Sequence, residues 1–447
     1  MFLFKVYVKG GFNLVYKRKT LFIVVLVLIT LMTSTLSVCA KPSVEVTVIA
    51  AIDHKVFDNT LIDRLGGKII YAAELAPVII VKLPSHAIEE FRKTHGMKHV
   101  SVDGVIYALA PPPGRGKRPK EQPPQVIPWG IDRINATEAW SISTGWVDVD
   151  GDGDSEVEVA VIDTGVDSDH PDLDKNIKWC VTVRFGRIFY GKCEDRNGHG
   201  THVTGTIAAE DNEIGVIGVA PDVEIYAIKA LTDAGYGTWS DLIIAIDLAV
   251  KGPDGEVDAD GDGVIVGDPD DDAAEVISMS LGGESPPEEL HEIIVAAYKY
   301  NVTLVAAAGN EGAETPTFPA AYPEVIAAGA IDSEDQVPDW SNRNPELTAP
   351  GVDVLSTYPD DTYETLSGTS MAAPHVSGVV ALMQAARLAN GMLVLPPGSL
   401  EEDTESSTVR GILHITADDL GDKGYDKLYG YGVVRGDLAV QKALEVK

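Results

Sequence analysis

Residues 157–163 read VEVAVID, a short apolar run that is rich in β-branched residues and ends on an aspartate. A run of this kind is typical of a strand that is buried on both faces of a parallel sheet. Similar runs recur downstream at 223–231, 274–282, 302–310 and 324–331, and helical segments such as 238–250 and 287–300 separate them. From about Val126 onward, this alternation predicts a three-layer α/β domain with a parallel sheet covered by helices on both faces.

Three polar motifs follow the apolar runs, where ligands bind in parallel α/β sheets. Asp163 ends the first strand, His199 lies between two glycines at the start of a helical segment, and Ser370 begins the segment SMAAPHVSG. An aspartate can orient a histidine, which in turn removes the proton of a serine hydroxyl. The order Asp, His, Ser along the chain is one of the known orders for such a triad.

Each of these residues also has a purely structural interpretation. An aspartate after a strand often caps a turn or a helix, and a serine at a helix start is a preferred N-cap. Only the combination of the three motifs, with glycines that leave each side chain accessible, favours nucleophilic catalysis over capping.

The chain is strongly acidic, with 447 residues and a formal net charge of −33. This charge argues against nucleic-acid binding, because phosphate would be repelled. The acidic residues are clustered, since 21 of the 68 lie within 148–174 and 254–275. A surface adapted to salt would spread its charge, so the clustering indicates cation-binding loops.

Two loops carry the spacing of the first half of an EF-hand loop, in which alternate carboxylates bind one calcium ion. Neither loop has a glutamate at its twelfth position, so we expect the remaining ligands to come from neighbouring acids. The alternative is a pair of solvated acidic loops. The predicted calcium ligands are Asp148, Asp150, Asp152, Asp154 and Glu156 in the first loop, and Asp258, Asp260, Asp262, Asp268, Asp270, Asp271 and Asp272 in the second.

The region before the α/β domain divides into three segments. Residues 1–40 combine basic residues, an apolar run and a small residue at Ala40, which predicts an export signal and a secreted protein. An uncleaved membrane anchor is the alternative. Residues 41–109 alternate β-rich and helical runs, as in a small α+β module, and the Pro- and Lys-rich residues 110–124 predict a linker to the domain at 125–447.

Cys180 and Cys193 flank two alternating segments that are hinged near Gly186. A hairpin there would bring the two sulfurs together, and in an oxidising compartment a disulfide is expected. Two unpaired thiols are the alternative. A zinc site is disfavoured, because two cysteines supply only half of a tetrahedral set.

Taken together, the motifs VAVIDTGVDSDHPDL, NGHGTHVTGTIAA, SMSLGG, VAAAGNEG and SGTSMAAPHVSG resemble those of the subtilisin-like serine proteases. The second acidic loop is similar to that of the calcium-rich subtilisins of hyperthermophilic archaea. The resemblance implies that Ser370 is the nucleophile, His199 the general base and Asp163 its orienting carboxylate. It also implies that Asn310 stabilises the oxyanion, and that Ser280–Gly283 pairs with the substrate and accepts a large apolar P1 side chain. His202 and His375 are expected to be packed helix residues.

The resemblance further implies a third calcium site, so several ions are expected. Its ligands would be the side chains of Gln125, Asp172 and Asn212 and the carbonyl oxygens of Glu210, Ile214 and Val216.

Residues 41–109 are identified by the same resemblance as a propeptide that assists folding, inhibits the enzyme and is released by self-cleavage at Leu109–Ala110. Its apolar end, VIYAL at 105–109, is expected to lie along the substrate cleft with Leu109 in the P1 pocket. We expect a monomeric endopeptidase that acts on proteins and peptides, binds no nucleic acid and meets the membrane only through its signal segment. The alternatives are an inactive, calcium-stabilised surface protein and an anchored protease of narrow specificity.

Overall fold

The computed structural model describes residues 44–109, 121–400 and 407–446. The predicted export signal at 1–40 and most of the predicted linker lie outside these ranges. Within them, no helix combines the length and the apolar character that a membrane crossing requires.

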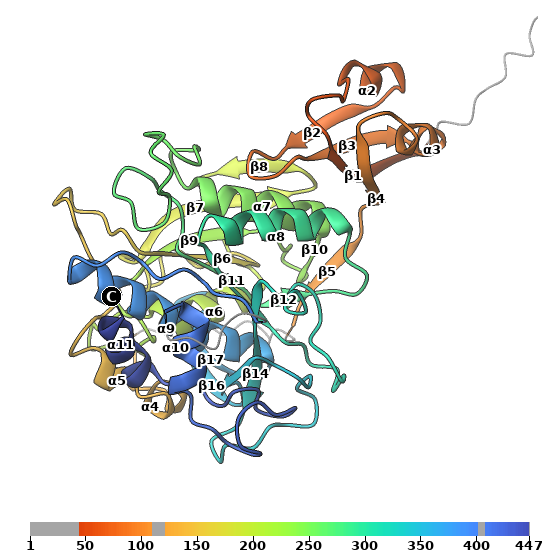
Figure 1. The fold of residues 1–447 in the computed structure, drawn as a ribbon. Coiled ribbons are helices and arrows are strands. Elements are labelled where there is room, and N and C mark those ends of the chain that lie inside the picture. The colour runs from red at the N-terminus through yellow and green to blue at the C-terminus, as the bar shows by residue number, and fades with distance from the viewer. Residues whose placement is uncertain (1–43, 110–120, 401–406, 447) are drawn as a thin grey trace, which may run out of the picture.

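An eight-stranded sheet forms the centre of the large domain (Figure 1). Its strand order is β15-β14-β13-β11-β6-β9-β7-β8, and every neighbouring pair is parallel except β7–β8. The predicted parallel sheet is therefore confirmed, with one antiparallel strand at its edge. The strands are β6 (Glu158–Asp163), β7 (Ile177–Arg184), β8 (Arg187–Tyr190), β9 (Glu224–Lys229), β11 (Val276–Met279), β13 (Thr303–Ala307), β14 (Val325–Ile331) and β15 (Leu347–Pro350).

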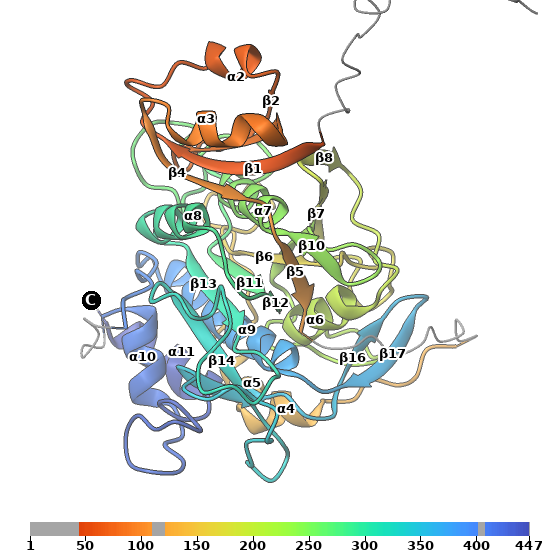
Figure 2. The same ribbon diagram turned by 90° about the vertical axis from the view of Figure 1, so that its right-hand side faces the viewer.

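Helices cover both faces of this sheet, which gives the predicted three layers (Figures 1 and 2). One face packs against α7 (Trp239–Lys251) and α8 (Glu288–Lys299), and the other against α6 (His199–Ala208) and α9 (Thr369–Ala389). The remaining elements of the domain are α4 (Trp129–Arg133), α5 (Ala136–Ala139), β10 (Tyr236–Thr238), β12 (Leu281–Gly282), β16 (Val354–Tyr358), β17 (Thr362–Leu366), α10 (Val409–Thr416) and α11 (Gly436–Glu445).

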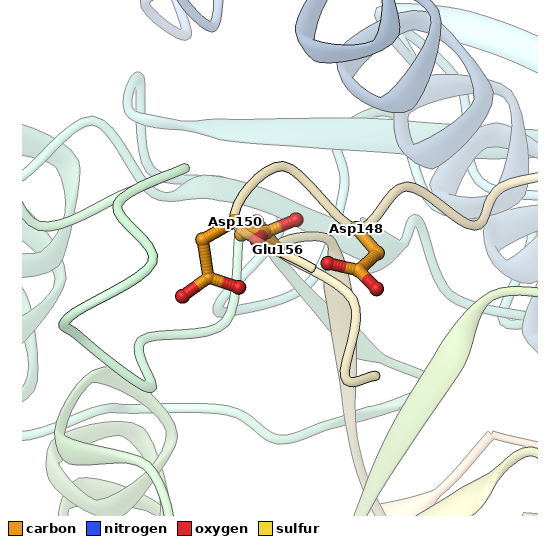
Figure 3. A group of neighbouring side chains, drawn as sticks. All are labelled: Asp148, Asp150 and Glu156. Atoms are coloured by element: carbon orange, nitrogen blue, oxygen red, sulfur yellow. The ribbon is translucent and has the colours of Figure 1, made fainter. Parts of the chain in front are cut away.

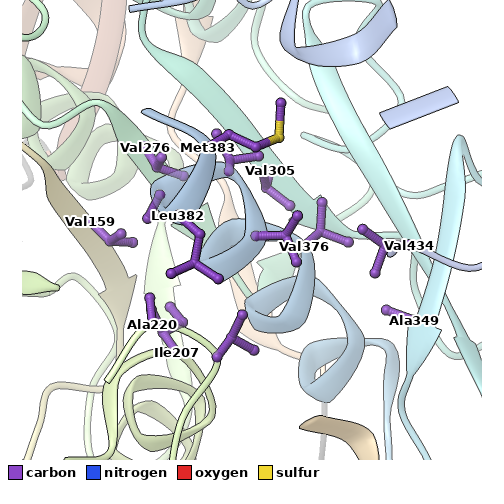
Figure 4. Packing of buried hydrophobic residues seen from close by; sticks show 14 of the residues in the cluster. Val159, Ile207, Ala220, Val276, Val305, Ala349, Val376, Leu382, Met383 and Val434 are labelled. Atoms are coloured by element: carbon purple, nitrogen blue, oxygen red, sulfur yellow. The ribbon is translucent and has the colours of Figure 1, made fainter. Parts of the chain in front are cut away.

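Helix α9 is buried on all sides over most of its length, from Thr369 to Arg387. Its apolar side chains contact the sheet residues Val159, Val276 and Val305, as Figure 4 shows. A helix that is apolar all round is stable only when it is enclosed in this way. The first turn of α9 is thereby fixed at the centre of the domain, beside the carboxyl ends of the strands.

The N-terminal module is a four-stranded antiparallel sheet with the order β2-β3-β1-β4 and short helices on one side. It rests on α7 and α8 of the large domain (Figure 2). Residues 97–108 form two strands, and the second of them, β5, leaves the module and enters the large domain. The elements are β1 (Glu45–Ile52), α2 (Thr60–Arg64), β2 (Lys68–Ala72), β3 (Val78–Pro84), η1 (Ser85–Ala87), α3 (Ile88–Arg92), β4 (Met97–Val102) and β5 (Val105–Ala108).

The predicted hairpin consists of β7 and β8, which turn at Phe185–Gly186, and a disulfide joins Cys180 to Cys193. The turn is held by the buried carboxylate of Asp241 in α7, which accepts hydrogen bonds from the backbone N–H groups of Phe185 and Gly186 at 2.9 and 2.8 Å. The hairpin therefore belongs to the sheet edge and is fastened to the helix layer beside it.

The packing of α9 leads to a test of the core. We expect Leu382→Ala to lower the free energy of unfolding by about 3 kcal/mol, because Leu382 is fully buried and its truncation leaves a cavity. Leu393→Ala is the control, since Leu393 is 80% exposed and should change stability by less than about 0.5 kcal/mol. Denaturant unfolding at a fixed calcium concentration, in a Ser370→Ala background, measures both values. Equal effects of the two variants would contradict the burial of α9.

Candidate active site

A cleft of about 950 Å³ lies at the carboxyl ends of the central strands, and the N-terminal module extends a strand into it. Strand β5 pairs antiparallel with β10 on one side and with β12 on the other. Tyr107 is opposite both Tyr236 and Gly282, so the cleft contains a complete three-stranded sheet. An extended segment bound between two cleft strands gains main-chain hydrogen bonds whatever its side chains are.

Leu109 ends this inserted segment. Its backbone N–H donates to the carbonyl of Ser280 at 3.3 Å, and its own carbonyl accepts a hydrogen bond from the side-chain amide of Asn310. A Cβ at Gly282 would lie 2.7 Å from Thr317 Cγ2 and 2.8 Å from the carbonyl oxygen of Phe318, and at an ordinary contact distance of 3.4 Å from Leu109 Cδ1. The glycine therefore lets Thr317 and Phe318 approach the cleft strand beside Leu109.

Thr369 fixes the amide of Asn310. The Oδ1 atom of Asn310 accepts hydrogen bonds from both the backbone N–H and the hydroxyl of Thr369, each at 2.9 Å. The same hydroxyl accepts from the N–H of Gly309 at 3.0 Å. With Oδ1 occupied, the N–H₂ group of Asn310 is directed at the Leu109 carbonyl. No motif pattern predicts this role for Thr369, although its position next to Ser370 indicates that it belongs to the site.

Asp163 and His199 form a buried pair at the end of β6 and the start of α6. Nδ1 of His199 lies 2.7 Å from Oδ1 of Asp163, and both side chains are almost fully buried. Burial disfavours the charged imidazole, but the neighbouring carboxylate more than offsets this, so the pKa of His199 is raised above its usual value. The predicted Asp–His contact is therefore present.

Ser370 lies in the first turn of α9, but its hydroxyl forms no hydrogen bond with His199. Ser370 Oγ donates to the carbonyl of Ser280 at 3.2 Å, and Nε2 of His199 has no hydrogen-bond partner among the described residues. Hydrogen bonds between catalytic groups are often long or poorly aligned outside the reacting complex. The structure thus brings four residues to one end of the cleft, namely Asp163, His199, Asn310 and Ser370. No hydrogen bond joins Ser370 to His199 in this arrangement.

Pro374 explains a second link between these serines. This proline lies in the second turn of α9, where its missing N–H leaves the carbonyl of Ser370 without its helical partner. The hydroxyl of Ser280 donates to that carbonyl at 2.8 Å. Ser280 and Ser370 therefore each donate a hydroxyl to the other's carbonyl.

The other two histidines near the site are packed residues, as expected. Nε2 of His202 lies 3.0 and 3.1 Å from the carbonyls of Val354 and Glu364, and Nδ1 of His375 lies 2.7 Å from that of Met371. Burial lowers the pKa of His202 to about 3 and that of His375 to about 4. Both rings are therefore neutral at ordinary pH.

The first acidic loop brings some of its predicted ligands together. One carboxylate oxygen from each of Asp148, Asp150 and Glu156 lies within 4.8 Å of the others. Figure 3 shows the three side chains of this loop. Asp152 and Asp154 are outside this group. Oδ1 of Asp152 accepts a backbone hydrogen bond at 2.9 Å from Asp154, whose own carboxylate lies 3.9 Å from Lys178 Nζ. Of the two later acids predicted as ligands, Glu156 alone is in this group.

The second loop gathers Asp258, Asp260 and Asp262 in the same way. Asp271 is directed at this loop, because its Oδ1 accepts a hydrogen bond from the N–H of Ala259 at 2.6 Å. Two buried oxygens here, Oδ1 of Asp258 and Oδ2 of Asp271, have no hydrogen-bond partner within the described ranges. Asp268, Asp270 and Asp272 are not in the group of three.

The third predicted ligand set also converges. The amide nitrogen of Gln125 lies 2.7 Å from the carbonyl of Glu210 and 3.2 Å from that of Val216. Oδ2 of Asp172 accepts from the N–H of Val216 at 2.9 Å, whereas its buried Oδ1 has no partner in the described part of the chain. Burial raises the pKa of Asp172 to about 7.

Asn212 completes the side chains of this set. Its Oδ1 accepts a hydrogen bond from the N–H of Ile214 at 3.1 Å, so the loop closes on itself. Buried oxygens without donors suit a calcium ion, which prefers carboxylate, amide and carbonyl ligands. The oxygens without donors therefore fit the predicted ion at the second and third sets, although Gln125 turns its amide nitrogen and not its oxygen toward the carbonyls of the third set. The first set offers three converging carboxylates.

Comparison with known proteins gives consistent matches. The model of the subtilase family matches residues 154–432. Subtilisin DY of Bacillus licheniformis is 38% identical over 323 residues, covering 71% of this chain and 100% of its own. Subtilisin E of Bacillus subtilis strain 168 is 32% identical over 391 residues, which cover 85% of each chain. M-protease of Shouchella clausii is 33% identical over 379 residues, which cover 84% of this chain and 82% of its own.

The buried pair leads to a test of its electrostatics. We expect Asp163→Asn to lower the pKa of His199, because burial then opposes the imidazolium without a carboxylate to offset it. Histidine ring signals followed by NMR across pH, in a Ser370→Ala background, measure this value. Asp339→Asn is the control, since Asp339 is fully exposed. An unchanged pKa in Asp163→Asn would refute the electrostatic role of the pair.

Proposed function

This chain belongs to the subtilase family and is a serine endopeptidase, and we propose that it is a calcium-dependent enzyme made as a self-processing precursor. Asp163, His199, Ser370 and Asn310 are proposed as its catalytic residues. Residues 41–109 are proposed as a propeptide, which is joined to the enzyme by the linker at 110–124.

The observation that carries the proposal is the position of Leu109 at the end of β5. Its carbonyl accepts from the amide of Asn310, while the residues before it pair with both cleft strands. This is the arrangement expected for the acyl half of a cleaved peptide that has stayed in the cleft. It supports cleavage at Leu109–Ala110, and it supports inhibition, because a substrate needs the same strands.

In the proposed reaction, Ser370 Oγ attacks the carbonyl carbon of the scissile bond and its proton passes to Nε2 of His199. Asp163 holds the ring so that this nitrogen is free to accept the proton, and its charge stabilises the imidazolium. The tetrahedral intermediate expels the amine, which takes the proton from His199. Water then hydrolyses the acyl-enzyme by the same proton transfers in reverse.

The negative oxygen of the intermediate is proposed to bind the side-chain amide of Asn310 and the backbone N–H of Ser370. The first donor is already directed by its contacts with Thr369. The second belongs to the first turn of α9, whose N–H groups have no partner within the helix. Donors fixed in advance stabilise the developing charge without having to reorganise.

The contacts of the N-terminal module support its proposed inhibitory role. The carboxylate of Asp247 in α7 is buried beneath the module and accepts hydrogen bonds from the hydroxyl of Tyr71 at 2.6 Å and the N–H of Leu75 at 2.8 Å. Lys251 forms an ion pair with Glu74 at 2.6 Å. These contacts hold the module on the enzyme independently of the cleft.

We propose a broad specificity with a preference for apolar P1 side chains. Leu109 packs beside Gly282, and Thr317 and Phe318 line the cleft nearby. Main-chain pairing of β5 does not depend on side chains, which supports broad recognition. We also propose that the protein is secreted and acts as a monomer on protein and peptide substrates.

Calcium is proposed to stabilise the fold at the three ligand sets described above. The ion would offset the repulsion between clustered carboxylates and add a cross-link to loops that hydrogen bonds already hold. The buried, unpartnered oxygens of Asp172, Asp258 and Asp271 support this proposal, because an unpaired buried carboxylate oxygen is costly.

The catalytic assignment is tested by single substitutions in the full chain. Ser370→Ala should remove casein hydrolysis and leave the precursor uncut, whereas the unaltered chain should yield a mature enzyme that begins at Ala110. Asn310→Ala should lower kcat about a hundred- to a thousandfold, the loss known for one such donor in a subtilisin. Peptide assays, mass spectrometry and N-terminal sequencing measure these results.

Proteolysis that persists in Ser370→Ala would reject the catalytic assignment. A mature N-terminus far from residues 105–122 would reject the proposed cleavage site. Ser377→Ala is the control, because Ser377 is a buried serine of the same helix that bonds to Ser278 and not to the cleft.

The calcium proposal is tested on full-length Ser370→Ala protein. Chelation should lower Tm, and Asp258→Asn should lose one ion and about 5–10 °C in Tm, since binding to the folded state alone adds stability. Native mass spectrometry counts the ions. Asp339→Asn, which changes an exposed acid outside the loops, should keep the full count. A chain whose mass and Tm do not respond to chelation would exclude the calcium sites.

A further inference from the structure

A second buried carboxylate, Asp195, lies at the start of α6 and has no role in the reaction described above. It is 3% exposed and accepts five hydrogen bonds. Three come from the backbone N–H groups of Asn197, Gly198 and Thr201, each at 2.9 Å. The other two come from the hydroxyls of Thr201 at 2.8 Å and Thr164 at 3.0 Å.

These hydrogen bonds hold the backbone before and after His199. The three N–H donors lie on both sides of it in the chain, so one carboxylate fixes the backbone that carries the imidazole. The glycine at the helix N-cap supplies no side-chain cap, and Asp195 takes over that function. An anion at a helix N-terminus is also favoured by the helix dipole.

The network also reaches the partner of His199. Thr164 follows Asp163, and its hydroxyl donates to Asp195 while accepting from the N–H of Gly200 at 2.8 Å. The backbone N–H of Thr164 lies 2.6 Å from Oδ1 of Asp163, the atom that contacts His199. Asp195 therefore joins the end of β6 to the start of α6, the two elements that carry the proposed pair.

The charge of Asp195 acts on the imidazole as well. Burial disfavours the charged ring, while Asp163 and then Asp195 act to raise the pKa of His199. Other ionisable groups nearby are His202 on α6, His375 on α9, and Lys229 on β9, whose ammonium group contacts the carbonyl of Thr164. Both histidines are neutral, so Asp195 is the second anion beside the ring. Burial raises the pKa of Asp195 itself, and its five hydrogen bonds oppose that shift.

We propose that Asp195 is a positioning residue for His199, which holds β6 and α6 in register and stabilises the protonated imidazole that forms during the reaction. This inference rests on the proposed role of His199 as the general base. It assigns a second carboxylate to the site in addition to Asp163, and that carboxylate touches neither the substrate nor the reacting atoms.

The test compares pH profiles of kcat/KM for the processed enzyme. Asp195→Asn removes the charge, so the imidazolium is less stable. The midpoint of the acid-side limb of the kcat/KM profile should therefore move to lower pH by roughly 0.5–1 unit. The plateau value of kcat/KM should fall about tenfold, because the amide cannot accept all five hydrogen bonds and the ring of His199 is held less well. Asp195→Glu keeps the charge and should keep the midpoint.

Asp241→Asn is the matched control. Asp241 is also a buried carboxylate that accepts backbone N–H groups, but its partners Phe185 and Gly186 lie in the β7–β8 turn. Asp241→Asn should lower the free energy of unfolding without moving the midpoint of the kcat/KM profile. An unmoved midpoint in Asp195→Asn, or a shift of the same size in Asp241→Asn, would overturn the electrostatic part of the proposal.

Thr164→Val tests the positioning part if Asp195→Asn does not fold. It retains the charge and the shape but removes the hydroxyl that joins Asp195 to β6, so kcat should fall several-fold with KM and the midpoint unchanged. An unchanged kcat in Thr164→Val would overturn the role of this hydroxyl.

His199→Ala distinguishes a failure of the proposed function from a failure of the proposal for Asp195. Activity in His199→Ala would refute the proposed function, whereas its loss beside a normal Asp195→Asn would refute only the role of Asp195.

Discussion

The burial of α9 is the constraint on which the rest of the site depends. A helix enclosed from Thr369 to Arg387 has only one place for polar chemistry, which is its first turn at the carboxyl end of the sheet. That turn presents Ser370, and Thr369 in the same turn orients Asn310 from a different segment. The apolar packing thus determines where the hydroxyl lies, and hydrogen bonds set the directions of the groups around it.

Strand β5 joins the two parts of the molecule. Its residues belong to the N-terminal module in sequence, but they complete a sheet with β10 and β12 of the large domain. Unpaired strand edges attract any extended peptide. A cleft built from two such edges is therefore suited to bind substrates, and it is covered for as long as the module's own strand occupies it.

The sequence was sufficient to predict the layers, the parallel sheet, the hairpin with Cys180 and Cys193, and the residues at the strand ends. These depend on local patterns of apolar residues and on motif spacing. Strand β2 has no clear signal in the sequence, because strand pairing is decided by distant partners. The apolar end of the module, residues 105–109, is in contrast predicted to lie along the substrate cleft, and β5 does lie there.

The hydrogen-bond network of the site was also beyond sequence reasoning. The roles of Thr369, Ser280 and Asp195 depend on contacts between segments far apart in the chain. In the first acidic loop, regular spacing suggested five ligands, whereas backbone geometry brings only Asp148, Asp150 and Glu156 together. Spacing identifies which residues are available, and the fold selects among them.

The reciprocal bonds of Ser280 and Ser370 have a consequence for how this sequence can vary. Because Pro374 leaves the Ser370 carbonyl unpaired, the hydroxyl of Ser280 serves as the substitute donor. Replacing Ser280 alone would leave a buried acceptor unsatisfied, whereas a residue with an N–H at position 374 would supply another donor to the same oxygen, which has lone pairs for both. The two positions are therefore coupled, and the loss of Ser280 is best tolerated when Pro374 is also replaced.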